Sequence, residues 1–177
     1  INVDGRFTKY TLYRLLIPGL ILEDRLLYID ADAIVTKDIR DFYYMDLGEN
    51  LIAGVLDIGI GPFLKNIDFE SDDIYINAGV TLMDLNSIRE LNLMEKWLMM
   101  VNTRFYDCHD QDILNITCKG RVALVPNRYN VSISTGLQVR DQAINIMHYA
   151  GPKPWDDYPN TPKRNVWNEI STMYDSM

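Results

Sequence analysis

Leu26-Leu27-Tyr28-Ile29-Asp30-Ala31-Asp32 is the stretch of sequence that decides the fold. A continuous apolar run closed by an acidic turn is typical of a strand buried on both faces in an α/β protein. Two carboxylates at the end of a strand can converge on one cation, and their oxygens suit Mg²⁺ or Mn²⁺. Because α/β sheets bind ligands beyond the carboxyl ends of their strands, Asp30 and Asp32 are candidate metal ligands. The alternative is that they only end the strand and cap a turn.

The rest of the chain alternates short apolar runs with longer amphipathic segments, which predicts an α/β layer fold. We expect further strands over 51–56, 74–82, 122–125 and 144–148. We expect helices over 8–16, ending before Pro18, from a capping box at 87–90, from Asp110 to near Gly120, and over 164–174. The second and fourth of these helices should bury apolar stripes, formed by Leu91, Met94, Trp97, Leu98 and Val101 and by Val166, Trp167, Ile170 and Met173.

Three further polar groups stand where strands end or helices begin. His148 ends an apolar strand and could be a third metal ligand, with Lys153 as a positive charge for phosphate, although a lone histidine is more often a core residue. Residues 110–112, Asp-Gln-Asp, could face a ligand at the start of a helix or could simply cap it. Asn77-Ala78-Gly79 is unusual inside a strand, where glycine indicates a close backbone approach or a structural turn.

Composition excludes several classes of protein. The 177 residues are 47% hydrophobic, which is enough for one domain with a core. The net charge of −8 argues against binding to nucleic acid. Cys108 and Cys118 form neither a disulfide framework nor a zinc motif, so a reducing cytoplasm fits best, with a single disulfide between them as the alternative. No apolar run approaches the length of a membrane helix and no signal peptide is visible, although peripheral contact with the inner face of a membrane stays open.

Other motifs of known chemistry are missing. Gly59-Ile60-Gly61-Pro62 lacks the third glycine of a dinucleotide fingerprint, and there is no P-loop or nucleophile-elbow serine. Two segments beginning at Asn115 and Asn130 match the N-glycosylation pattern, which we regard as coincidence in the absence of a secretory signal.

Four motifs in this order resemble glycosyltransferase family 8, the retaining sugar transferases that include bacterial lipopolysaccharide galactosyl- and glucosyltransferases and glycogenin. They are residues 26–32, 75–80 (Tyr-Ile-Asn-Ala-Gly-Val), 110–115 (Asp-Gln-Asp-Ile-Leu-Asn) and 148–155 (His-Tyr-Ala-Gly-Pro-Lys-Pro-Trp). The resemblance implies a GT-A type fold, with a mixed sheet flanked by helices. It also implies transfer of galactose or glucose from a UDP-sugar to a glycan or lipid-linked glycan such as lipopolysaccharide.

The resemblance also assigns roles to residues. It implies Mn²⁺ or Mg²⁺ held by Asp30, Asp32 and His148, and an acceptor-side role for Asp57. The donor would contact Arg14, Asn77, Ala78, Asp110, Gln111, Gly151 and Lys153, and the reaction centre would lie at Asp110, Gln111 and Asp112. Since an amide is a poor nucleophile, we favour front-face attack, with Gln111 steadying the sugar, over double displacement.

The family carries a further nucleotide-binding segment before the part that matches here. We therefore expect residues 1–177 to be a single but partial catalytic domain, truncated at its N-terminus. A non-catalytic remnant that binds a UDP-sugar is the first alternative. A haloacid-dehalogenase-type phosphohydrolase, which also uses an Asp-X-Asp pair, is the second, although Ala33 and His148 stand where that class needs other residues.

Overall fold

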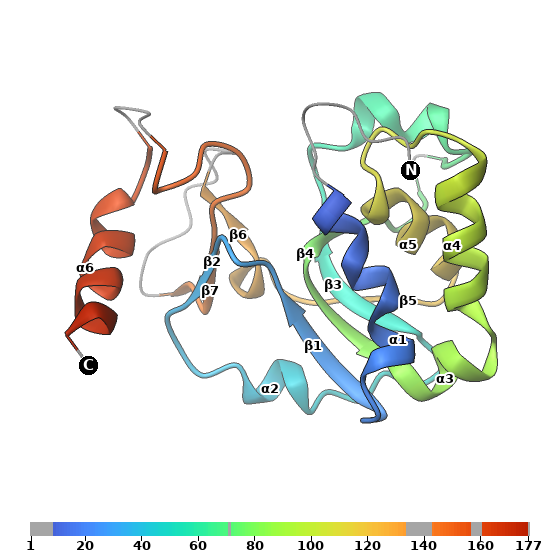
Figure 1. Cartoon of the computed structure of the whole chain (residues 1–177), viewed down its shortest axis with the longest axis horizontal. Helices are drawn as coiled ribbons and strands as arrows, with labels where there is room; N and C mark the ends of the chain where they lie inside the picture. Colours follow the sequence, from blue (N-terminus) through green and yellow to red (C-terminus); the bar gives the residue numbers. More distant parts are fainter. Residues whose placement is uncertain (1–8, 71, 134–142, 157–160, 177) are drawn as a thin grey trace.

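A computed structural model describes residues 9–70, 72–133, 143–156 and 161–176 (Figure 1). Two sheets lie side by side, with most of the helices against the larger one and the C-terminal helix beyond the smaller one. The mixed α/β architecture expected from the sequence is confirmed. The prediction that the chain is a single partial domain stays a prediction.

The larger sheet has four strands in the order β1-β4-β3-β5. Their bounds are Arg25–Ile29, Ile76–Asp84, Ile52–Leu56 and Val122–Leu124, in that spatial order. β4 is antiparallel to both of its neighbours, and β5 is parallel to β3. β1 packs apolar side chains into the core on both faces, as predicted, but it is only half-buried, because β4 is its only strand partner among the described residues.

The smaller sheet has the order β2-β7-β6, formed by Ala33–Val35, Ile146–His148 and Val131–Ser132. β2 is antiparallel to β7, and β6 is parallel to it. The sequence predicted β7 but not its two partners, which are only three and two residues long. Strands so short carry no readable alternation and form because their neighbours supply hydrogen bonds.

The helices cover the larger sheet on both faces. One apolar cluster joins Leu15, Ile88, Trp97 and Ile113 of helices to Met83 of β4, and a second cluster lies around Phe42 on the other face. None of the helices among the described residues is long and apolar enough to cross a membrane. The helical segments are η1 (Lys9–Leu16), α1 (Ile17–Leu20), α2 (Arg40–Tyr43), η2 (Gly61–Asn66), α3 (Leu85–Glu90), α4 (Leu93–Thr103), α5 (Asp110–Cys118), η3 (Asn127–Tyr129) and α6 (Arg164–Asp175).

Two helix boundaries differ from the prediction. The first helical segment is a 3₁₀ helix that continues as α1 through Pro18, because proline in a first turn needs no backbone N–H partner. Thr8, the predicted start, lies outside the described residues. The expected helix from Ser87 is two helices separated by Asn92 in the left-handed conformation, and Asp84 caps the first by accepting a hydrogen bond from the Ser87 amide.

Two predicted apolar stripes are only partly buried. In the stripe over 91–101, Trp97 is fully buried, whereas Leu91, before the break at Asn92, and Leu98, next to Trp97 in α4, are exposed. In α6, Trp167 packs against the small sheet, but Met173 is 67% exposed. The predicted packing of the last two turns of α6 is therefore wrong for the described residues.

Candidate functional site

The acidic loop 30–32 joins the two sheets. The amide of Asp30 donates to the carbonyl of Gly79 in β4 at 2.7 Å, and the carbonyl of Asp32 accepts from the amide of Tyr149, just after β7, at 2.9 Å. The amide of Ala33 closes the turn on the carbonyl of Asp30 at 3.0 Å. The chain therefore crosses from one sheet to the other at this loop, which places both carboxylates at the junction.

An irregularity in β4 lies against this loop. From Gly54 to Leu56 the partner strand advances two residues, whereas from Thr81 to Ile76 β4 covers five, so β4 carries 5 − 2 = 3 extra residues. Such a bulge lets backbone groups leave the strand ladder and meet other partners. The Ala78 carbonyl accepts from Arg14, and its amide donates to Gln111. The unusual residues 77–79 are thus the part of the strand that faces the candidate site.

Asp30, Asp32 and His148 come together as a possible metal site. One ligand atom of each lies within 4.8 Å of the others. His148 Nε2 is 3.7 Å from Asp30 Oδ2 and 3.3 Å from Asp32 Oδ1. A Cβ on Gly79 would lie 2.2 Å from His148 Cε1, so only glycine lets the imidazole approach. Two carboxylate oxygens and one imidazole nitrogen fit a divalent cation of the Mn²⁺ or Mg²⁺ kind.

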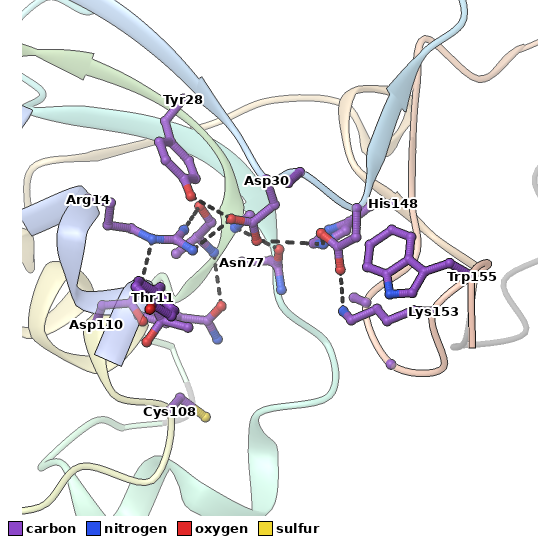
Figure 2. A pocket seen from close by; sticks show the side chains of 18 residues that line it. Thr11, Arg14, Tyr28, Asp30, Asn77, Cys108, Asp110, His148, Lys153 and Trp155 are labelled. Carbon is purple, nitrogen blue, oxygen red and sulfur yellow. Dashed lines mark hydrogen bonds and ion pairs between the residues drawn. The ribbon is translucent and has the colours of Figure 1, made fainter. Parts of the chain in front are cut away.

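Arg14 organises the opposite wall of the site, as Figure 2 shows. Its guanidinium pairs with Asp30 at 2.8 Å and with Asp110 at 2.6 Å, donates to the Ala78 carbonyl at 2.5 Å, and lies over the Tyr28 ring at 4.3 Å. Burial raises the pKa of Asp110 to about 6, although the positive charge of Arg14 acts in the other direction. Tyr28 donates to Asp30 Oδ1 at 2.8 Å, so that oxygen is occupied and Oδ2 is left toward His148.

Lys153 fills the other side of the site (Figure 2). Its ammonium pairs with Asp32 Oδ2 and donates to the Tyr149 carbonyl at 3.2 Å. Burial would raise the pKa of Asp32, but the hydrogen bonds of His148 and Lys153 and the charge of Lys153 outweigh it and lower the pKa to about 2. Asp32 is therefore ionised at neutral pH, as a metal ligand must be.

Gln111 is held at both ends of its amide. Its Oε1 accepts from the Ala78 amide at 2.9 Å, and its Nε2 donates to Asp57 Oδ2 at 3.1 Å. Asn77 Nδ2 donates to the same Asp57 oxygen at 3.1 Å. Asp57 therefore lies behind Gln111 and Asn77 and orients both.

Asp112 faces away from the others. It is almost fully buried, accepts from the Tyr75 hydroxyl at 2.6 Å, and accepts from the Cys108 amide at 2.9 Å. These bonds fix the loop that precedes α5. Its catalytic role stays a prediction, but its surroundings are those of a residue that holds the loop.

A cavity of about 700 Å³ opens over this arrangement. Every predicted metal and donor residue lines it, whereas Asp57 and Asp112 do not. The lining also includes residues that the sequence analysis did not single out. Tyr28 could have been found, since it precedes Asp30 by two positions in a strand and so shares its face. The others are Tyr10, Thr11, Ala31, Cys108, Ala150 and Trp155.

Known proteins are similar to this chain in sequence over most of its length. Residues 3–158 match the model of glycosyl transferase family 8. General stress protein A of Bacillus subtilis is 29% identical over 93% of this chain and 65% of its own length. Lipopolysaccharide 1,2-glucosyltransferase of Escherichia coli is 29% identical over 91% of this chain and 52% of its own length. The chain thus spans between half and two thirds of these relatives.

A solved structure gives the same fold. The galactosyltransferase LgtC, in complex with donor and acceptor sugar analogs, superposes with a TM-score of 0.80 at 24% identity, over 97% of this chain and 70% of that one. The GT-A type fold expected from the sequence is confirmed.

Proposed function

Because the chain belongs to glycosyl transferase family 8, we propose that it transfers a hexose, galactose or glucose, from a UDP-sugar to a glycan acceptor with retention. The convergence of Asp30, Asp32 and His148 on one wall of the cavity supports this most directly. Lipopolysaccharide is the proposed kind of acceptor, since relatives carry that substrate in their names. Family membership contradicts the phosphohydrolase alternative. The cytoplasmic location stays a prediction.

A Mn²⁺ or Mg²⁺ ion held by Asp30, Asp32 and His148 would supply charge neutralisation and Lewis acidity to the departing diphosphate. Lys153 adds a positive charge beside the same position, and Gly151 lines the cavity next to it. These residues would therefore bind the diphosphate end of the donor.

The opposite wall would bind the sugar. Asn77, Ala78, Asp110 and Gln111 line it, and Arg14 fixes Asp110. No carboxylate among these residues is free to attack the sugar, because Asp110 is paired with Arg14. Since the Gln111 oxygen already accepts from an amide, front-face attack by the acceptor is favoured over a covalent intermediate. A glycosyl adduct trapped on Gln111 or Asp112 would contradict this mechanism.

Thermal unfolding with UDP, Mn²⁺, both or neither tests the donor site. At a hundredfold excess over its dissociation constant, a ligand adds about 2.7 kcal/mol to the free energy of unfolding. For a chain of this size that corresponds to a rise in Tm of about 5–11 °C. We expect the full rise only with both ligands, and we expect Asp32→Asn to lose it. Asp38→Asn, which changes an exposed aspartate paired with Arg40, is the matched control.

Turnover separates the enzyme from a remnant that only binds. UDP release from UDP-galactose or UDP-glucose that disappears in Asp30→Asn supports the transferase. UDP binding without any transfer or hydrolysis supports the non-catalytic remnant. No stabilisation by either ligand would contradict a working donor site in this chain.

A further inference from the structure

One buried contact of His148, a candidate metal ligand, is not explained by donor binding. His148 Nδ1 lies 2.8 Å from Asn130 Oδ1, and the two residues are 3% and 6% exposed. Asn130 precedes β6, which pairs with the strand that ends at His148, so the small sheet places it behind the imidazole. Asn130 does not line the cavity. In the sequence it stands out only as the first residue of an N-glycosylation pattern.

A series of hydrogen bonds determines which atom donates and which accepts in the contact between Asn130 and His148. Asn130 Nδ2 donates to Asn77 Oδ1 at 2.9 Å, and Asn77 Nδ2 donates to Asp57 Oδ2 at 3.1 Å. The backbone amide of Gly79 also donates to Asn77 Oδ1, at 3.1 Å. An ionised carboxylate can only accept and a backbone amide can only donate, so both ends of this series have a fixed polarity.

The orientation of the Asn77 side-chain amide determines the orientation of the Asn130 side-chain amide. Because Asp57 and Gly79 fix which end of the Asn77 amide accepts, Asn130 must present its Nδ2 to Asn77 and its Oδ1 to His148. A flipped Asn130 would set its oxygen against the oxygen of Asn77. The imidazole nitrogen that faces an acceptor must carry the proton, so a neutral His148 carries it on Nδ1.

The other nitrogen then presents its lone pair to the acidic loop. His148 Nε2 faces Asp30 Oδ2 at 3.7 Å and Asp32 Oδ1 at 3.3 Å, so three electron-rich atoms converge. In neutral histidine this arrangement is suited to a cation, and metal-bound histidines usually have the second nitrogen fixed by such a partner.

We propose that Asn130 is a positioning residue that holds His148 as the Nδ1–H tautomer, with its direction set by the hydrogen-bond chain to Asp57 and Gly79. The role in metal binding rests on the proposed function, whereas the tautomer does not depend on it. The same series of hydrogen bonds connects His148, a candidate metal ligand, with Gln111, a proposed sugar-binding residue, because Asp57 also accepts from Gln111.

The tautomer can be measured directly in the metal-free protein. Long-range ¹⁵N–¹H correlation spectra distinguish the protonated ring nitrogen from the bare one at a pH where the imidazole is neutral. The chain has two histidines, so His148→Gln assigns the spectrum and His109 serves as an internal reference. We expect Nδ1–H for His148 in the unmodified chain. Finding Nε2–H would overturn the proposal without any variant.

Two variants separate positioning from packing. Asn130→Leu has about the same volume but no acceptor, and we expect a mixture of tautomers and about a 10–100-fold loss of Mn²⁺ affinity by calorimetry. Asn130→Asp keeps an acceptor for Nδ1–H, and we expect it to retain the tautomer and most of the affinity. An unchanged tautomer in Asn130→Leu, or equal losses of tautomer and affinity in both variants at unchanged His109 signals, would overturn the proposal.

The same measurements keep the two proposals apart. If the unmodified chain binds no Mn²⁺ with UDP present but shows the Nδ1–H tautomer, the metal-dependent function fails and the assignment of Asn130 stands. If it binds Mn²⁺ but shows Nε2–H, the function stands and the role of Asn130 fails.

Discussion

Replacing Gly79 by alanine would test the candidate metal site through a single methyl group. The added Cβ would lie 2.2 Å from His148 Cε1, 2.9 Å from His148 Nδ1 and 2.8 Å from Asp30 Oδ2. The new Cβ cannot stay this close to any of these three atoms. The backbone of β4 is held in place by β1 and β3 on its two sides. The imidazole and the carboxylate must therefore move, and they are two of the three candidate ligands.

The size of the effect follows from overpacking. Inserting a methyl group into a packed site costs about 1–3 kcal/mol, which lowers the Tm of a chain of this size by about 2–12 °C. The affinity for the metal should fall as well. Because His148 must leave its position between Asn130 and the acidic loop, we expect at least about a tenfold weaker binding of Mn²⁺, the lower end of what a disturbed ligand shell costs.

Calorimetric titration with Mn²⁺ in the presence of UDP, together with thermal unfolding, measures both effects. Gly61→Ala is the matched control, since a Cβ there meets no atom within 4 Å. We expect the control to bind Mn²⁺ like the unmodified chain. If Gly79→Ala binds Mn²⁺ within twofold of the unmodified chain, the close approach of His148 is not needed for the metal site and the reasoning fails.

Three further substitutions, two of residues that hold the site in place and one in the core beneath it, are measured by urea unfolding. Arg14→Met should cost about 3–5 kcal/mol, because Asp110 would be left as a buried charge without its partner; a smaller loss than in an exposed Arg40→Met control would contradict the ion pair. Asp112→Leu should cost about 1–3 kcal/mol, since it leaves the buried Tyr75 hydroxyl and the Cys108 amide without their acceptor; loss of activity at unchanged stability would instead favour the catalytic role. Trp97→Ala should cost about 3–5 kcal/mol by opening a cavity in the core, and a cost below 1 kcal/mol would mean that α4 is not anchored there.

Some parts of the site could be predicted because their signals are local. Asp30 and Asp32 follow a strand directly, and Gly79 stands out inside one, so the candidate metal ligands and the close approach could be expected from neighbouring residues. Asn130 carries no such signal. Its importance comes from β6 lying beside β7, a pairing that involves two residues of each strand.

The different surroundings of the two aspartates of α5 are also determined by the tertiary structure. Asp110 and Asp112 look alike in the sequence, as acidic residues in a first helical turn. The first lines the cavity and pairs with Arg14, whereas the second turns toward Tyr75 and the loop before the helix. Which one faces the ligand depends on how the helix is rotated against the sheet, and no local pattern encodes that rotation.

The sequence by itself determined the α/β class, most of the longer helices and strands, and the four motifs that identify the family, because periodicity and short-range polar patterns are written along the chain. Only the tertiary structure decided where the breaks at Asn92 and in β4 lie, which apolar stripes are buried, and how the amides behind His148 are oriented. Those features depend on hydrogen bonds and contacts between segments far apart in the chain, such as Asn77 with Asn130 and Arg14 with Asp110. Their energies exist only once both sheets have formed.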